Sequence, residues 1–235
     1  MQPAPAHAVP AGPLGVRWLA YEVEPLEAGR VGRARVELEN AGAAQWHDVH
    51  LSYHWLDDLG NAIIWDGLRA ALPELSPGER ATVELPIRGW IPPGSYRLAL
   101  DLVLEHRYWL SEIGNEMLET SLEVAPRNAA GAVAHLPPEV EAGPGWHDAV
   151  RAAHEEGYSA IGGAIESRDR ALRAYRPGPG RNPGFGEPLV CPSLLPPLEP
   201  NCEVAGLPAW RPAPFDTATW EPWIYDARIS ARLRR

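Results

Sequence analysis

Apolar and polar residues alternate over short segments throughout residues 14–125, which is the pattern of half-buried β-strands. The clearest case is the segment LSYHWL at 51–56. Its two faces are Leu51, Tyr53 and Trp55 on one side, and His50, Ser52 and His54 on the other. The turn DDLGN follows, and its Asp, Gly and Asn residues tolerate the positive φ values that close a hairpin. A short apolar segment at 62–65 then predicts the second strand of this hairpin.

Further segments of the first half predict five more strands, each bounded by turns that contain proline, glycine or asparagine. They span residues 16–23, 30–39, 81–87, 97–105 and 117–124. Short strands at near-regular spacing are typical of an antiparallel immunoglobulin-like β-sandwich. We therefore expect such a sandwich over residues 14–125, without a helix of more than two turns. The side chains expected in its core include Tyr53, Trp55, Leu98 and Leu100.

The second half has less regular patterning and more proline. Residues 177–222 hold 12 of the 26 prolines, which nearly excludes long regular elements there. The elements expected are a linker at 126–144, helices at 145–156 and 168–175, and strands at 158–165 and 223–233 that pair with each other. The sequence thus predicts a mainly β protein, in which a smaller proline-rich α+β region, 145–235, packs on the sandwich. Residues 1–13 are expected to be a disordered leader.

The charge of the chain narrows the classes of partner. The net charge is −10, and all 21 basic residues are arginines that form no basic cluster, which argues against binding to nucleic acid or to an anionic membrane surface. No apolar run is long enough to insert into a membrane, and residues 1–15 lack the features of a secretory signal. We therefore expect a cytoplasmic protein with Cys191 and Cys202 as free thiols, and no cofactor is indicated.

A succession of short motifs resembles a known domain type. The motifs are Asn40-x-Gly42, Trp46, LSYHWLD, Gly60, WDGLR, Leu72-Pro73, Pro77-Gly78-Glu79, Pro93-Gly94-x-Tyr96 and LDLVLE before Trp109. This order is similar to the immunoglobulin-like or fibronectin type III-like domain attached to bacterial glycosyltransferases and methyltransferases of envelope polysaccharide clusters. The resemblance covers residues 14–125. It implies a β-sandwich that serves as a spacer, a dimerising module or a sugar-binding module, and it carries no catalytic residue.

Aromatic and charged residues near the predicted strand ends form the main candidate site. They are Trp65, Asp66, Arg69, Tyr108 and Trp109. An exposed aromatic ring beside a carboxylate and a guanidinium is suited to a sugar, because the ring stacks on the sugar and the polar groups hydrogen-bond its rim. The alternative is that these aromatic rings close the ends of the core.

Other candidate residues have weaker patterns. Arg176 and Arg181 lie in a glycine-rich and proline-rich loop that could hold an anion, but a structural loop is the favoured interpretation because the prolines remove amide donors. The histidines near 47–54 are interpreted as a solvated strand face rather than a metal site. His147 and His154 lie on one helical face about two turns apart, and neither is assigned a catalytic role.

Three functions are consistent with these features. The favoured one is a non-catalytic accessory or carbohydrate-binding protein linked to bacterial envelope polysaccharide biosynthesis, with a glycan or a sugar-nucleotide enzyme as its partner. The second is a sugar-modifying or transferase-like enzyme with a site between the sandwich and the C-terminal region. The third is a structural interaction module that forms a homodimer through a sheet edge.

Overall fold

The computed structural model describes residues 1–129, 140–158, 160–166, 180–182 and 223–233. The chain divides into two compact units. Unit 1 comprises Met1–Leu26, Val31–Gly89 and Gly94–Ala125, and unit 2 comprises Glu27–Arg30, Trp90–Pro93 and the described residues from Pro126 onward. Two short segments from within the range 14–125 therefore belong with the C-terminal part of the chain.

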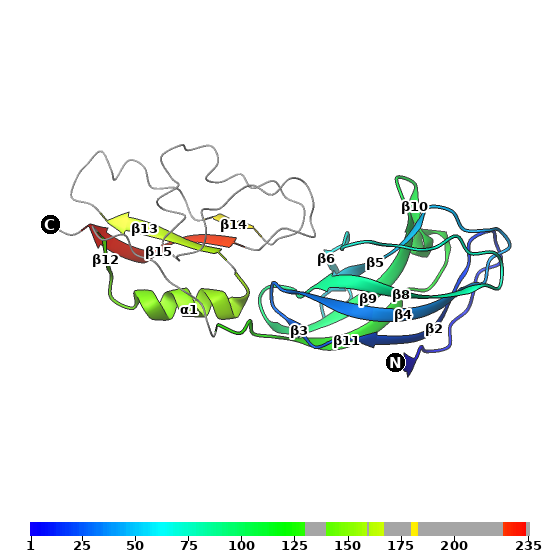
Figure 1. Ribbon diagram of the computed structural model, residues 1–235, viewed down its shortest axis with the longest axis horizontal. Coiled ribbons are helices and arrows are strands. Elements are labelled where there is room, and N and C mark those ends of the chain that lie inside the picture. The colour runs from blue at the N-terminus through cyan, green and yellow to red at the C-terminus, as the bar shows by residue number, and fades with distance from the viewer. Residues whose placement is uncertain (130–139, 159, 167–179, 183–222, 234–235) are drawn as a thin grey trace. The chain divides into compact units, whose positions relative to one another are not determined.

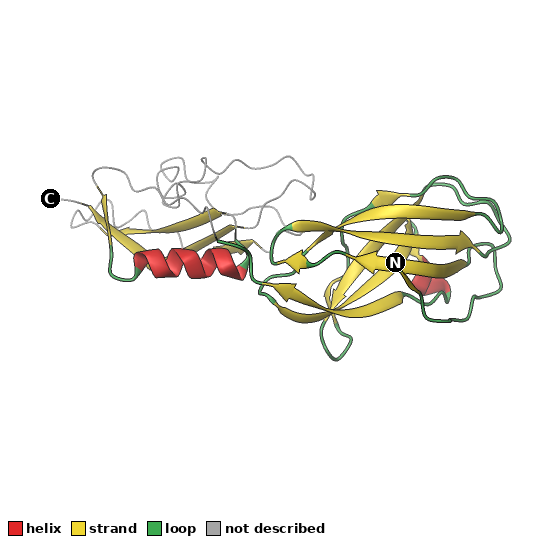
Figure 2. Ribbon diagram, turned by 60° about the horizontal axis from the view of Figure 1, so that its bottom comes forward, coloured by secondary structure: helices red, strands yellow, loops and turns green. Residues whose placement is uncertain are grey.

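Unit 1 is a β-sandwich, as the alternation predicts, and its two layers of strands are visible in Figures 1 and 2. One sheet has the order β1-β2-β4-β8 and the other the order β3-β11-β9-β5-β6, with β10 added beside β9 and β7 beside β5. The strands of the first sheet are β1 Gln2–Pro3, β2 Val16–Val23, β4 Val31–Asn40 and β8 Arg80–Arg88. Those of the second are β3 Leu26–Glu27, β5 Val49–Leu56, β6 Ala62–Ile64, β7 Ala70–Ala71, β9 Gly94–Leu104, β10 Tyr108–Trp109 and β11 Leu118–Ala125. The residues of unit 1 are all described, and a 3-10 turn, η1 Leu110–Ile113, is its one helical element, so the fold class predicted from the sequence is confirmed.

The core lies between the two sheets, and the residues predicted to fill it do so. Tyr53, Trp55, Leu98 and Leu100 are all fully buried. The two large aromatic side chains satisfy their polar atoms on the backbone of Arg88: the indole Nε1 of Trp55 donates to its carbonyl, and the hydroxyl of Tyr53 accepts from its amide, both at 3.0 Å. Burial raises the pKa of Tyr53 to about 12.

The range 1–13, expected from the sequence to be a disordered leader, contains a short strand. Gln2–Pro3 forms strand β1, which pairs antiparallel with β2 through Gln2↔Tyr21 and Pro3↔Ala20. Farther along, the amide of Val16 donates to Asn115 Oδ1 at 2.9 Å. Pairing with β1 satisfies backbone groups that β2 would otherwise leave open at the edge of its sheet. A prediction from composition alone misses this, because the pairing is made by the backbone.

The described part of unit 2 contains a four-stranded sheet and one helix. Its elements are β12 Val140–Ala142, α1 Trp146–Glu156, β13 Ala160–Glu166, β14 Gly180–Asn182 and β15 Trp223–Leu233. Strands β13 and β15 pair in parallel, which confirms the pairing predicted between the segments 158–165 and 223–233. Strand β12 pairs with β15 and lies within 126–144, so part of the expected linker is a strand.

Helix α1 confirms the helix predicted at 145–156. It buries Trp146, Val150 and Ala153, and it ends before Gly157, whose φ of 126° suits a residue without a side chain. No helix among the described residues has the length and apolar content needed to cross a membrane. The helix predicted at 168–175 and most of the proline-rich segment lie outside the described residues. The packing of the C-terminal region on the sandwich stays a prediction.

Candidate functional site

The candidate site lies on the outer face of the sheet that contains β5, β9 and β10. Side chains of successive strand residues point to opposite faces, so Ser52 and His54 lie on the face away from the core. Ser52 pairs with Asp101 of β9, and Trp109 of β10 pairs with Val103, two residues farther along the same strand. Residues paired across antiparallel strands share a face. The topology therefore brings Ser52, His54, Asp101 and Trp109 together on one surface of the sheet.

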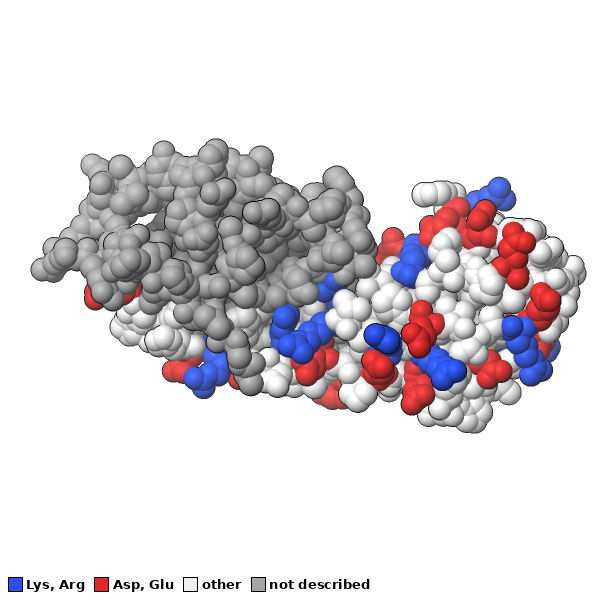
Figure 3. Space-filling model, viewed as in Figure 1, with Lys and Arg blue, Asp and Glu red and all other residues white. Residues whose placement is uncertain are grey.

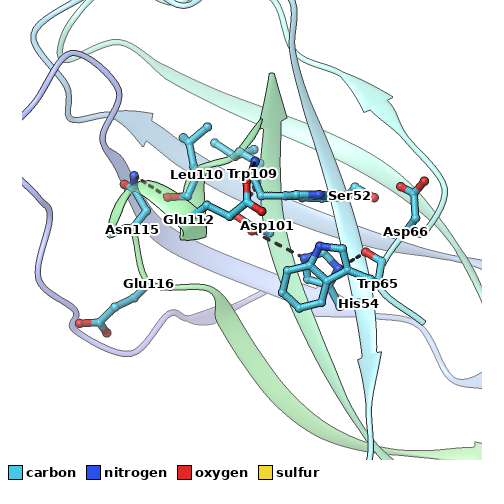
Figure 4. Close-up of polar contacts among 12 residues, drawn as sticks. Ser52, His54, Trp65, Asp66, Asp101, Trp109, Leu110, Glu112, Asn115 and Glu116 are labelled. Carbon is cyan, nitrogen blue, oxygen red and sulfur yellow. Dashed lines mark hydrogen bonds and ion pairs between the residues drawn. The ribbon is translucent and has the colours of Figure 1, made fainter. Parts of the chain in front are cut away.

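Two tryptophans cover His54. The ring of Trp65 stacks on the imidazole with 3.9 Å between ring centroids and 15° between planes. The ring of Trp109 meets the imidazole edge-on, with 4.5 Å between centroids and 63° between planes. His54 has no exposed surface, whereas Trp65 is 40% exposed. The ring of Trp65 thus lies over the imidazole, as Figure 4 shows, while the residue itself stays partly exposed.

We call the exposed ring of Trp65, with His54 beneath it and Trp109 beside it, the tryptophan platform. The rings of Trp65 and Trp109 are 6.2 Å apart between centroids and inclined at 72°. Because the ring of Trp65 stacks on His54 and contacts Trp109 at its side, it has little freedom to move. The platform is therefore a flat aromatic surface that is already formed without a ligand.

A buried polar pair lies below the platform (Figure 4). Nδ1 of His54 bonds the carbonyl oxygen of Trp65, and because a carbonyl only accepts, Nδ1 carries the hydrogen. Nε2 lies 3.6 Å from Asp101 Oδ2, and neither atom has a hydrogen-bond partner. Asp101 Oδ1 accepts from the amide of Leu102 at 2.7 Å. The expectation of a solvated strand face is wrong for His54, which is fully buried and covered by Trp65 and Trp109.

Arg69 supports the platform from the side. Its guanidinium carbon lies 4.9 Å from the ring centroid of Trp109, a cation–π contact. Its polar contacts are Nε to Glu105 Oε1 at 2.6 Å, Nη1 to Ser52 Oγ and to the Gly67 carbonyl at 2.9 Å each, and Nη2 to Asp66 Oδ1 at 2.5 Å. A guanidinium has five N–H donors, and four of them are engaged in these contacts. Arg69 therefore fixes Trp109 and the chain around it.

The segment WDGLR, residues 65–69, places Trp65 and Arg69 beside β5 because the chain at Gly67 passes close to that strand. The amide of Gly67 donates to the carbonyl of Tyr53 at 3.0 Å. A Cβ at Gly67 would lie 2.6 Å from that carbonyl oxygen and 2.7 Å from the Tyr53 ring. Glycine permits this close approach, and the residues on either side of it, Asp66 and Leu68, are then set at the edge of the sheet.

A second local device holds Trp109. Its amide donates to Glu112 Oε2 at 3.0 Å at the start of η1, and Gly114, with φ 93°, ends that turn. Tyr108 precedes it in β10 and points to the opposite face, since adjacent strand residues alternate. Of the five residues predicted for the site, the structure thus gathers Trp65, Asp66, Arg69 and Trp109, and leaves Tyr108 outside the cluster.

The remaining candidates do not converge on one place. His47 contacts Glu74 at 3.0 Å and His50 lies 3.9 Å from Glu105. Across the described ranges, no group of three or more His, Cys, Asp or Glu residues is placed to hold a metal ion. Arg176 lies outside the described residues, and Arg181 is part of β14.

The two histidines of helix α1 have different surroundings. His147 is exposed, whereas His154 is 6% exposed and its Nδ1 donates to the Tyr158 carbonyl at 2.8 Å. Burial lowers the pKa of His154, opposed in part by that hydrogen bond and reinforced by the charge of Arg127. Because one ring is in solvent and the other is buried, the two do not form an acid–base pair.

Four residues beneath and beside the platform were not predicted as site residues from the sequence: Ser52, His54, Asp101 and Glu105. One signal was present, a single aspartate inside the apolar strand LALDLVL. A lone acid in such a segment indicates a buried polar partner on the neighbouring strand.

Comparison with known proteins yields distant likenesses of fold. No family model and no curated protein matches the chain. The C-terminal domain of Wzt shares 9% identity at a TM-score of 0.37, with 52% of this chain and 78% of that domain covered. A β-glucosidase involved in saponin metabolism from intestinal bacteria shares 15% at 0.32, with 48% of this chain and 16% of that chain covered. A PapD-like domain of human CEP192 shares 18% at 0.23, with 51% and 86% covered. These likenesses concern the fold of the sandwich and transfer no function to this chain.

Proposed function

We propose that the protein is a non-catalytic carbohydrate-binding module and that the tryptophan platform is its binding site. The observation that carries the proposal is the partly exposed ring of Trp65, stacked on a fully buried histidine. Large aromatic rings are left in solvent less often than they are buried, because exposure forfeits their hydrophobic stabilisation. A flat apolar ring with polar groups at its rim is suited to the face of a sugar ring, which carries C–H groups on its faces and hydroxyls around its edge.

The platform is also rigid, which favours binding. His54 holds the ring of Trp65 from below, and Trp109 is fixed in turn by Arg69 and Glu112. A preformed surface loses little conformational entropy when a ligand binds. The carboxylate of Asp66, whose side chain is 71% exposed beside the platform, is available to accept hydrogen bonds from sugar hydroxyls.

The same geometry argues against catalysis by the His54–Asp101 pair. A general acid or base must reach the reacting group within hydrogen-bond distance. Both side chains are buried below the tryptophans, with 0% and 2% of their side-chain surface exposed. The pair supports the platform and does not face a ligand. The link with envelope polysaccharide biosynthesis rests on the sequence resemblance of residues 14–125, and we include it in the proposal on that ground.

The proposal is tested by titrating the full chain and Trp65→Ala with a panel of oligosaccharides. Removal of the exposed ring is expected to weaken binding by about tenfold or more, equivalent to about 1.4 kcal/mol. The free energy of unfolding is expected to fall by less than about 2 kcal/mol, because the ring is partly in solvent. A matched control is Ile113→Ala, since Ile113 is 41% exposed and lies outside the platform.

Three results would overturn the proposal. The first is that no oligosaccharide of the panel binds the wild-type protein. The second is that Trp65→Ala loses about 3 to 5 kcal/mol of stability, as expected for an indole that closes the core. Binding that is equally weakened by Ile113→Ala would show that the platform is not the site.

A further inference from the structure

The charges around the tryptophan platform indicate the class of glycan that it accepts, an inference that rests on the proposed function. We propose that the site binds uncharged sugar residues and rejects sugars that carry a carboxylate or a phosphate. Two observations support this preference: the nearest guanidinium is already occupied, and carboxylates outnumber guanidinium groups around the platform.

Arg69 is the basic residue in contact with the platform, and its hydrogen-bonding capacity is nearly exhausted. Its Nε, Nη1 and Nη2 atoms bind Glu105, Ser52, the Gly67 carbonyl and Asp66. Two carboxylates therefore already share its single positive charge. Recognition of an anionic sugar by arginine uses a free pair of parallel N–H donors. Arg69 does not present such a pair.

Acidic side chains predominate around the platform. Asp66 and Glu105 flank Arg69, Asp101 lies beneath His54, and Glu112 holds the amide of Trp109. The basic side chains of the same neighbourhood are Arg69, the exposed Arg107 at the β9–β10 turn, and Arg97, which lies on the same face of β9 as Asp101 and is paired with Glu119. Figure 3 shows Asp and Glu side chains near β10, and acidic and basic side chains interspersed over the rest of the visible face of the sandwich. An anionic sugar would meet net negative charge there, whereas neutral hydroxyls would meet hydrogen-bond acceptors.

The test compares matched pairs of ligands on the full chain at low ionic strength. Neutral gluco-, manno- and galacto-oligosaccharides are paired with their C6-oxidised counterparts, which differ by a carboxylate in place of a hydroxymethyl group. A nucleoside diphosphate sugar serves as the phosphorylated probe. We expect the oxidised and phosphorylated ligands to bind more weakly by a factor of at least about ten, with the difference narrowing as salt is added.

Asp66→Asn is the informative variant. It removes one of the two negative charges that share the guanidinium of Arg69, so the preference for the neutral member of each pair is expected to narrow. Glu84→Gln removes a charge of the same sign from β8 in the other sheet, where the side chain is 68% exposed, and is expected to leave the preference unchanged.

The outcomes separate the two proposals. Equal or tighter binding of the oxidised ligands would overturn the charge inference and leave carbohydrate binding intact. If Asp66→Asn and Glu84→Gln change the preference for neutral ligands by the same amount, the charges around the platform are not its cause, and the assignment of the preference to this site is overturned. Absence of binding by every ligand would overturn the proposed function, and the inference with it.

Discussion

The buried pair below the platform allows a prediction about stability. When His54 is neutral, its Nε2 and Asp101 Oδ2 are two acceptors that face each other at 3.6 Å, and neither has a hydrogen-bond partner. Replacing Asp101 with asparagine keeps the shape of the side chain and supplies an N–H₂ donor opposite Nε2. The oxygen that accepts from the Leu102 amide is retained.

The expected gain follows from the cost of an unsatisfied buried group, which is about 1 to 3 kcal/mol. Asp101→Asn is therefore expected to raise the free energy of unfolding at pH 8 by at least about 1 kcal/mol. For the sandwich of residues 14–125, this gain in the free energy of unfolding corresponds to a rise in Tm of about 4 °C or more. The measurement is urea unfolding of the full chain followed by tryptophan fluorescence.

The control for this experiment is Asp58→Asn, which makes the same chemical change at an exposed position of the β5–β6 turn. Surface changes of this kind shift stability by within about 0.5 kcal/mol. If Asp101→Asn is no more stable than this control, or is less stable, then His54 Nε2 and Asp101 Oδ2 are not two facing acceptors, and the reasoning is wrong.

Two further predictions concern pH. Burial holds the pKa of His154 below its usual value of 6.5, so the unfolded chain binds the proton more readily; protection of helix α1 against hydrogen exchange should fall as pH drops below 6.5, and His154→Gln should flatten this dependence. Burial raises the pKa of Tyr53 from 10.0 to about 12, so stability should be lost as pH rises through that interval. Tyr53→Phe should remove this alkaline loss in urea unfolding curves, and a loss of equal size in the variant would refute the assignment.

The extent to which the sequence predicts this structure depends on whether the interactions are local. The strand at 49–56 and its inward face follow from alternation, because the period of a strand is a local property. Alternation does not show whether the second face of a strand meets solvent or a neighbouring segment. His54 is buried because Trp65 and Trp109, 11 and 55 positions later in the chain, cover it. A contact between segments so far apart leaves no periodic pattern in the sequence.

The candidate site was likewise predicted only in part. The pairing of aromatic residues with Asp66 and Arg69 indicated a surface of sugar-binding chemistry, and the structure gathers four of the five residues. The sequence did not indicate that Arg69 fixes Trp109, because Glu105, a partner of Arg69, lies 36 positions farther along the chain. Tyr108 shows the opposite limit, because it adjoins Trp109 in sequence but lies on the other face of the strand.

The hydrogen bond between Val16 and Asn115 joins residues 99 positions apart and has a consequence for synthesis on the ribosome. At a translation rate of about 5 to 20 residues per second, about 5 to 20 seconds separate the appearance of the two residues. Until β9, Gly94–Leu104, and β11, Leu118–Ala125, have been made, the second sheet is incomplete and does not fully cover the side chains of Ala34, Val36 and Leu38 on β4. The side chains that alternate with them, Arg33, Arg35, Glu37 and Glu39, are all charged, and charges along a strand disfavour association of nascent chains through their uncovered strands.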